Sequence, residues 1–134
     1  MCYYLYGAVN KEVDLEDYYE VAKSENYQFN VGTKHNVKMA ILNCNMDYRL
    51  TEGHCDCCTT LGGGNPDDEH IKELASLLEE YRYIKNINHV YLSLNWNGKI
   101  NRREKTIHID DINIFEFLAN IEGNCLYKIE LYQR

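Results

Sequence analysis

Residues 65–85 carry the pattern that most restricts how this chain can fold. Asn65 is typical of a helix N-cap and Pro66 of the first helical position, and the acidic residues at 67–69 complement the helix dipole. Arg82 and Lys85 complement its other end. Six apolar residues between them recur with the period of an α-helix: Ile71, Leu74, Leu77, Leu78, Tyr81 and Ile84. The segment therefore predicts an amphipathic helix with one face in a core.

Other segments alternate between apolar and polar residues, which is typical of half-buried β-strands. The dipeptide Asn97-Gly98 follows one of them and favours a type I′ turn, so we expect a hairpin whose return strand occupies residues 99–109. In another segment the alternation changes phase once, which indicates a bulge or two successive strands. The predicted strand segments are residues 2–9, 37–50, 90–96 and 125–131.

Two shorter helices complete the expected elements. Asp14 is a candidate cap for a helix that places Leu15, Tyr18, Tyr19 and Ala22 on one face. Asp111 is expected to open a helix that carries Ile112, Phe115, Leu118 and Ala119 and stops at Gly123. Strands joined by short turns and mixed with helices predict an α+β fold. We expect a single domain over residues 1–134: a mainly antiparallel or mixed sheet, about three helices packed on it, and a Cys/Gly-rich loop at 51–65.

Composition restricts the environment and the partners. A chain of 134 residues with 45% apolar and 26% charged residues matches one ordinary globular domain. The net charge of −7 argues against nucleic acid and anionic membranes as partners. No apolar run approaches the roughly 20 residues of a membrane span, and the first residues lack the basic start of a secretory signal. We therefore expect a cytoplasmic protein whose six cysteines are reduced.

The chemically distinctive segment is His54-Cys55-Asp56-Cys57-Cys58, with three thiols and an imidazole within five residues. Thiolates and imidazoles are the ligands that zinc prefers. The gap between Cys55 and Cys57 is narrower than the usual zinc knuckle, so further ligands would come from His54 or Cys58 together with Cys2 or Cys44. One interpretation is therefore a zinc site built around this loop.

Two other interpretations of the loop remain open. The first is a reactive thiol activated by backbone N–H groups of the adjacent glycine segment, with His54 as base, although Asp56 disfavours a low thiol pKa. The second is a loop without ligands, in which one or two thiols are simply buried.

Two short segments also resemble a group of small bacterial proteins. Met1-Cys2-Tyr3-Tyr4 and His54-Cys55-Asp56-Cys57, followed by Leu61-Gly62, are similar to that group's opening Met-Cys-Tyr-Tyr and its His-Cys-Asp-Cys-Gly-Thr-x-Leu-Gly loop. The resemblance implies no activity, but it implies that Cys2 acts together with Cys55 and Cys57. Cys58 replaces the glycine that is usual in the group, so no role carries over to it.

One basic cluster stands out in this acidic chain, and Glu104 is the only opposing charge within it: Lys99, Arg102, Arg103 and Lys105. With Trp96 or Tyr91 available to stack on a ring, the cluster is a candidate site for a small anionic ligand. The alternative is that these charges protect an exposed edge strand from pairing with another molecule.

Two further features have both a chemical and a structural interpretation. Leu61-Gly62-Gly63-Gly64 leads into a helix N-terminus, where phosphates bind, but it lacks the lysine and hydroxyl of a P-loop. The acidic residues at 67–69 would also repel an anion, so a flexible connection is the better interpretation. His108 and Asp110 would share one side of a strand, which is the arrangement of an acid–base or metal pair. The sequence supplies no third member for it.

The sequence thus predicts a small binding protein with a thiolate-rich, zinc-binding loop, which recognises a protein or a small anionic ligand. The alternative is a cysteine-dependent enzyme that uses Cys55 or Cys57 with His54. A third hypothesis is an interaction module whose edge strand joins another protein or a second copy, forming a homo-oligomer.

Overall fold

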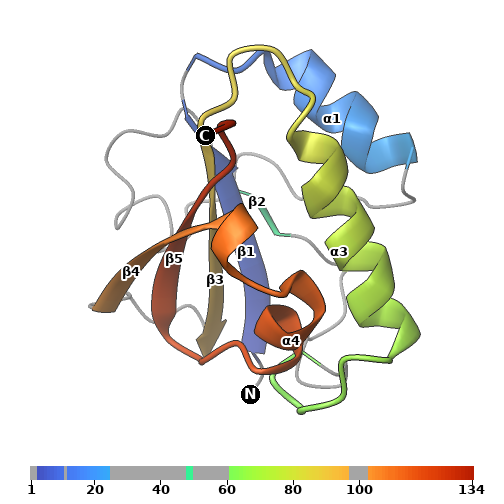
Figure 1. Cartoon of the computed structure of the whole chain (residues 1–134), viewed down its shortest axis with the longest axis vertical. Coiled ribbons are helices and arrows are strands. Elements are labelled where there is room, and N and C mark those ends of the chain that lie inside the picture. Colours follow the sequence, from blue (N-terminus) through green and yellow to red (C-terminus); the bar gives the residue numbers. More distant parts are fainter. Residues whose placement is uncertain (1–2, 11, 25–47, 50–60, 97–102) are drawn as a thin grey trace.

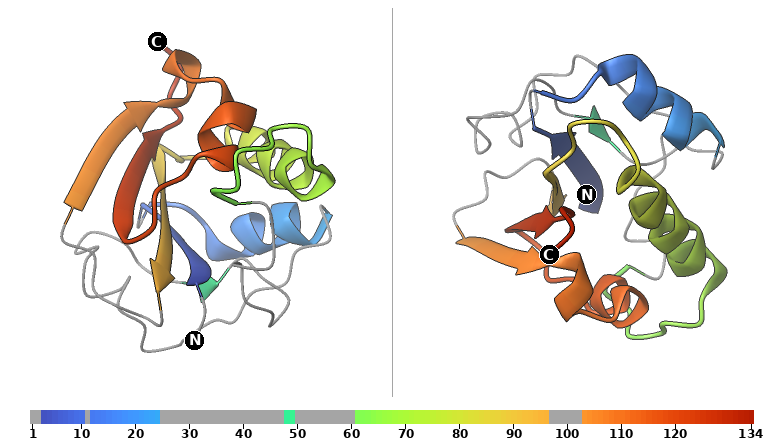
Figure 2. Two further views of the ribbon diagram at one scale, coloured as in Figure 1. Left: turned by 90° about the horizontal axis from the view of Figure 1, so that it is seen from below. Right: turned by 45° about the horizontal axis from the view of Figure 1, so that its top comes forward.

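The computed structural model describes residues 3–10, 12–24, 48–49, 61–96 and 103–134. In this part of the chain five strands form one sheet, and three α-helices cover one of its faces (Figures 1 and 2). The fold is therefore α+β, as the sequence predicts. None of the helices in the described ranges is long and apolar enough to cross a membrane.

The sheet has the order β2-β1-β3-β5-β4. Its long strands are β1 (Tyr3–Val9), β3 (His89–Trp96), β4 (Arg103–His108) and β5 (Cys125–Glu130), and the two-residue β2 (Tyr48–Arg49) lies at one edge. The pairs β2–β1, β1–β3 and β3–β5 are antiparallel, whereas β4 and β5 are parallel. The sheet is therefore mixed and mostly antiparallel.

The predicted hairpin between residues 90–96 and 99–109 is wrong. β4 lies at the edge, and β5 stands between it and β3 (Figure 1). β5 buries four of its six residues, whereas the first four residues of β4 are exposed. An apolar strand gains most from neighbours on both sides, while a charged strand suits an edge. The parallel pair is connected through a helix, as parallel neighbours require.

The three helices are α1 (Leu15–Ser24), α3 (Glu69–Tyr81) and α4 (Ile114–Ala119). α3 presents the predicted face to the sheet, because its periodic apolar side chains are fully buried: Ile71, Leu74, Leu77, Leu78 and Tyr81. They form one core cluster with Val90, Leu92 and Ile129 of the sheet. Tyr18 of α1 stacks on Tyr81 with 4.6 Å between ring centroids, which fixes α1 to α3.

The bounds of α3 differ from the prediction. The Asn65 side chain accepts a hydrogen bond from the Asp67 N–H (3.2 Å), and its carbonyl accepts one from the Asp68 N–H (3.4 Å). These bonds close a turn, so the helix begins at Glu69 instead of Pro66. It ends at Tyr81 and is followed by turns up to Asn86, whose φ is 68°.

α4 is also shorter than predicted. The N-cap is Asn113, whose Oδ1 accepts from the N–H groups of Phe115 (3.1 Å) and Glu116 (3.2 Å). Asp111 lies in a preceding 3₁₀ turn and pairs with Arg134 instead. The helix ends with Asn120 as C-cap, before Gly123.

Candidate functional site

The predicted metal ligands lie outside the described residues: Cys2, His54, Cys55, Cys57 and Cys58. The cysteine that the structure does describe, Cys125, is a buried free thiol on β5. Within the described ranges, no group of three or more His, Cys, Asp or Glu side chains is arranged to hold a metal ion. The zinc site and the cysteine-dependent enzyme therefore both stay predictions from sequence.

The basic cluster is described only in part, since Lys99 and Arg102 lie outside the described ranges. Arg103 and Lys105 are exposed on β4, and both pair with the carboxylate of Glu122 at 3.4 Å. One acidic residue thus partly neutralises the two described cations. An anionic ligand would have to compete with Glu122 for them. No local pattern signals this contact, because Glu122 is 17 residues from Lys105.

Trp96 and Arg103 lie at the same end of the sheet, but not on neighbouring strands. Trp96 ends β3 and Arg103 begins β4 opposite Cys125, with β5 between them. Two strand spacings put their backbones roughly 10 Å apart. Trp96 and the described basic residues are therefore not cross-strand neighbours, as they would be in the predicted hairpin.

His108 and Asp110 are adjacent, but the histidine is used by the fold. Its ring is 3% exposed, and its Nε2 donates to the carbonyl oxygen of Tyr132 at 2.7 Å. Its Nδ1 accepts from the backbone N–H of Asp110 at 3.1 Å. These two bonds require the neutral tautomer with hydrogen on Nε2, so both ring nitrogens are occupied. The bond from His108 to Tyr132 holds the end of β4 against the segment after β5.

The glycine segment also has a structural role. The N–H of Gly62 donates to the carbonyl oxygen of Leu118 (3.2 Å), and that of Gly64 donates to Ala119 (2.7 Å). Both glycines have positive φ, 75° and 85°. Their N–H groups thus bind the last carbonyls of α4 and are not directed at a phosphate. The segment joins the beginning of α3 to the end of α4.

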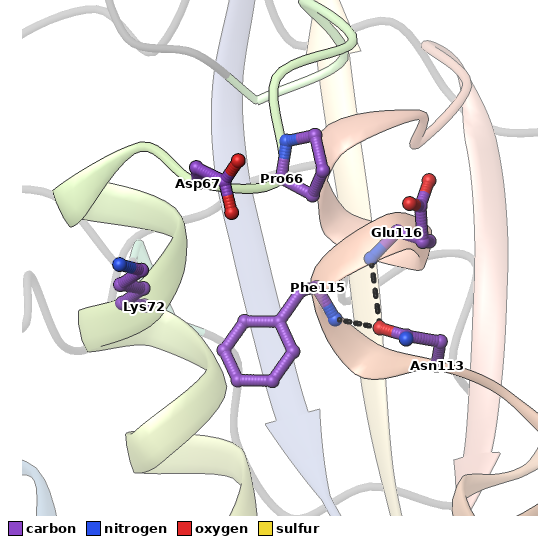
Figure 3. A pocket seen from close by; sticks show the side chains of 6 residues that line it. All are labelled: Pro66, Asp67, Lys72, Asn113, Phe115 and Glu116. Atoms are coloured by element: carbon purple, nitrogen blue, oxygen red, sulfur yellow. Dashed lines mark hydrogen bonds between the residues drawn. The ribbon is translucent and has the colours of Figure 1, made fainter.

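A concave surface in the described part of the chain lies between α3 and α4 (Figure 3). It consists of two hollows that share Lys72 and Phe115 as lining residues, and we call it the α3–α4 groove. The first, about 250 Å³, is lined by Pro66, Asp67, Lys72, Asn113, Phe115 and Glu116. The second, about 450 Å³ and mainly apolar, is lined by Lys72, Ala75, Ser76, Glu79, Ile114 and Phe115.

Phe115 is held between the two hollows by the local structure of α4. Ile114 and Leu118, one helical turn apart, are buried in the core, which turns Phe115 outward. The Asn113 cap fixes the backbone at Phe115 (Figure 3). The ring extends toward α3 and remains 41% exposed.

The prediction that Asp111 opens the helix that carries Phe115 is wrong. The helix begins three residues later, and its inward stripe runs through Ile114 and Leu118. Their four-residue spacing was the signal that could have identified Phe115 as outward-facing.

Three acidic residues line the α3–α4 groove: Asp67, Glu79 and Glu116. Residues 66–81 and 113–119 contain seven acidic residues and one lysine, a net charge of −6 out of the chain's −7. In the part of the chain that the structure describes, no ion pair engages the carboxylates of Asp67 and Glu116, which stand on either side of Pro66 above the Phe115 ring in Figure 3. The groove therefore combines an apolar floor with a negative potential.

Comparison with family models, curated proteins and solved structures finds no match for this chain.

Proposed function

We propose that this protein is a small binding protein and that the α3–α4 groove is the surface on which it recognises another protein. The observation that carries the proposal is the position of Phe115. A large aromatic ring is 41% exposed between two hollows, while its backbone is fixed by a cap and by buried neighbours. Rigid aromatic side chains beside pockets are the residues that contribute most to protein interfaces.

Site-specific crosslinking tests this proposal. Phe115, and in a separate sample Tyr83, is replaced by the photoreactive amino acid benzoylphenylalanine. Tyr83 is the control, because it is an 80% exposed aromatic residue that lines a different hollow, of about 410 Å³, between α1 and the end of α3. A protein crosslinked at position 115 is identified, purified and bound to the unmodified chain.

We expect Phe115→Ser to weaken that complex by at least about tenfold and Tyr83→Ser to leave it unchanged. Equal crosslinking at both positions, or a complex that is indifferent to Phe115→Ser, would contradict the proposal.

The thiolate-rich loop supports a second proposal, that the protein also holds zinc through Cys55 and Cys57 with ligands from Cys2, His54 and Cys58. The density of thiols in the sequence supports it. Native mass spectrometry of protein purified without chelator should show one additional zinc mass. Denaturation should release that metal together with at least three titratable thiols.

Alkylation separates this proposal from its alternative. A zinc site should resist alkylation until a chelator is added, whereas a cysteine-dependent enzyme should be alkylated quickly at neutral pH. A metal-free native mass with freely titratable thiols would end the zinc proposal.

A further inference from the structure

The residues that line the α3–α4 groove restrict the chemical class of ligand that can bind there. We infer that the occupant is a segment of a partner protein in which an apolar side chain stands next to a lysine or arginine. This inference rests on the proposed function and specifies the class of partner. Three observations carry it: the apolar floor, the placement of the carboxylates around that floor, and the concentration of the chain's negative charge on these two helices.

The apolar floor sets the first requirement. Phe115 shares the second hollow with Ile114 and Ala75, and both of these are at least nine-tenths buried. Only the ring of Phe115 therefore offers a large apolar surface to a ligand there. A flat aliphatic or aromatic side chain laid on the ring would remove apolar area from water on both partners.

The carboxylates set the second requirement. Asp67 and Glu116 border the first hollow, and Glu79 borders the second. Glu79 already contacts Arg82 at 3.6 Å, so the strongest unmet demand for a cation is at Asp67 and Glu116. A cation beside the apolar side chain would be attracted by these carboxylates and could also contact the face of Phe115.

Among the described residues that line the groove, Lys72 is the one with a positive charge. Its removal therefore tests the inference with an effect opposite to that of removing a carboxylate. Lys72 is exposed, and it lines both hollows. A cationic occupant is repelled by Lys72 and attracted by Asp67 and Glu116. Removing the lysine should therefore tighten binding, and removing either carboxylate should weaken it.

Three small probes with one apolar body and different charges test the inference: phenylbutylamine, phenylbutanol and phenylbutyrate. Each is titrated into the full chain at low salt, and the amide NMR shifts of Ala75, Ser76 and Phe115 are followed. We expect the amine to bind about threefold to fivefold more tightly than the alcohol, with the acid weakest. The preference should shrink when ionic strength rises from about 0.02 M to about 0.5 M.

Variants assign the preference to particular charges. Asp67→Asn with Glu116→Gln should reduce the advantage of the amine over the alcohol to less than about twofold, whereas Lys72→Met should increase it by about twofold. Glu104→Gln removes an exposed carboxylate on β4 and should change nothing. Phe115→Ser should weaken all three probes together.

The other outcomes overturn either the inference or the proposed function on which it rests. Equal binding of amine and alcohol refutes the cationic requirement but leaves protein recognition at Phe115 to the crosslinking test. Absence of groove shifts with all three probes refutes the inference as a whole. Groove shifts caused by raising the protein concentration alone, with dimers in light scattering, would identify a second copy as the occupant. A cationic preference without any crosslinked protein at position 115 would retain the site and refute the proposed function.

Discussion

His89 begins β3, and its buried Nε2 has no hydrogen-bond partner among the described residues. Burial lowers the pKa of His89 below its ordinary value of 6.5, and Lys128 lowers this pKa further, against the opposing effects of Glu12 and Glu130. In the unfolded chain the imidazole titrates near 6.5, so below that pH the unfolded state binds a proton that the folded state does not. The free energy of unfolding should therefore fall as pH decreases below 6.5 toward the lower pKa of the folded state.

The measurement is urea unfolding at about pH 7.5 and about pH 5.5, on either side of the ordinary histidine pKa. His89→Gln keeps a polar side chain but removes the titration. The variant should lose less stability than the unmodified chain between the two pH values, whatever its stability at the higher pH. Equal losses would show that His89 does not contribute to the acid sensitivity of the fold.

Glu122 is the second residue whose role can be isolated. Because Arg103, Lys105 and Glu122 are all about half exposed or more, Glu122→Gln should change the free energy of unfolding by less than about 1 kcal/mol. The same change frees both cations, so E122Q protein should bind pyrophosphate more tightly than the unmodified chain in calorimetry at low salt. Glu116→Gln is the matched control and should have no such effect. Unchanged pyrophosphate binding in E122Q would remove the described part of the basic cluster from consideration as an anion site.

Among the elements, the glycine segment offers a comparison between two neighbouring substitutions. Gly62 and Gly64 both have left-handed φ values, so an alanine at either position is strained by about 1–2 kcal/mol. A Cβ on Gly62 would in addition stand 3.0 Å from the backbone oxygen of Ile121, whereas a Cβ on Gly64 meets nothing within 4 Å. Gly62→Ala should therefore destabilise the protein more than Gly64→Ala, as measured by urea unfolding.

A Gly62→Ala variant as stable as Gly64→Ala would show that the contact between the glycine segment and the end of α4 yields easily. In that case the α3–α4 groove would lack one of the connections that fix its width.

The edge strand β4 bears on whether two copies of this chain could pair through their sheets. Symmetric antiparallel pairing of two β4 strands would place Lys105 opposite Lys105, or Arg103 opposite Lys105 with Glu104 opposite Glu104. Like charges directly opposite each other destabilise a sheet. The charges of β4 therefore favour its interpretation as a protected edge, and a homo-oligomer formed through this strand is disfavoured.

Sequence patterns predicted those elements whose burial follows from a local period. The stripe from Ile71 to Tyr81 is the buried face of α3, and the alternating Val90, Leu92 and Leu94 are the β3 residues that enter the core cluster. The strand order was not predictable in this way, because the Asn97-Gly98 signal is local, whereas the position of β5 depends on competition among strands for the centre of the sheet. The partners of Gly62, more than 50 residues away at the end of α4, were likewise invisible to a local pattern.

At the scale of the whole molecule, strands distant in sequence are neighbours in the sheet. Val9 of β1 pairs with Val90 of β3, and the core cluster takes residues from all three helices. The prediction of a single domain over residues 1–134 can therefore be tested by cooperativity. Far-UV circular dichroism reports the helices, and fluorescence reports the one tryptophan, Trp96, at the end of β3. Both signals should give the same urea midpoint in one transition. Two separate midpoints would indicate two units that unfold independently.

The place of β5 between β3 and β4 has a consequence for the order of events during synthesis. The ribosome makes β3 and β4 before β5, yet both strands need β5 as their common neighbour. Until residues 125–130 emerge, β3 can pair with β1 along one edge only, and its other edge is left without a strand. In the described sheet β4 then has no partner. Nascent chains stopped before Cys125 should therefore recruit chaperones or aggregate, whereas chains released beyond Leu131 should resist proteolysis.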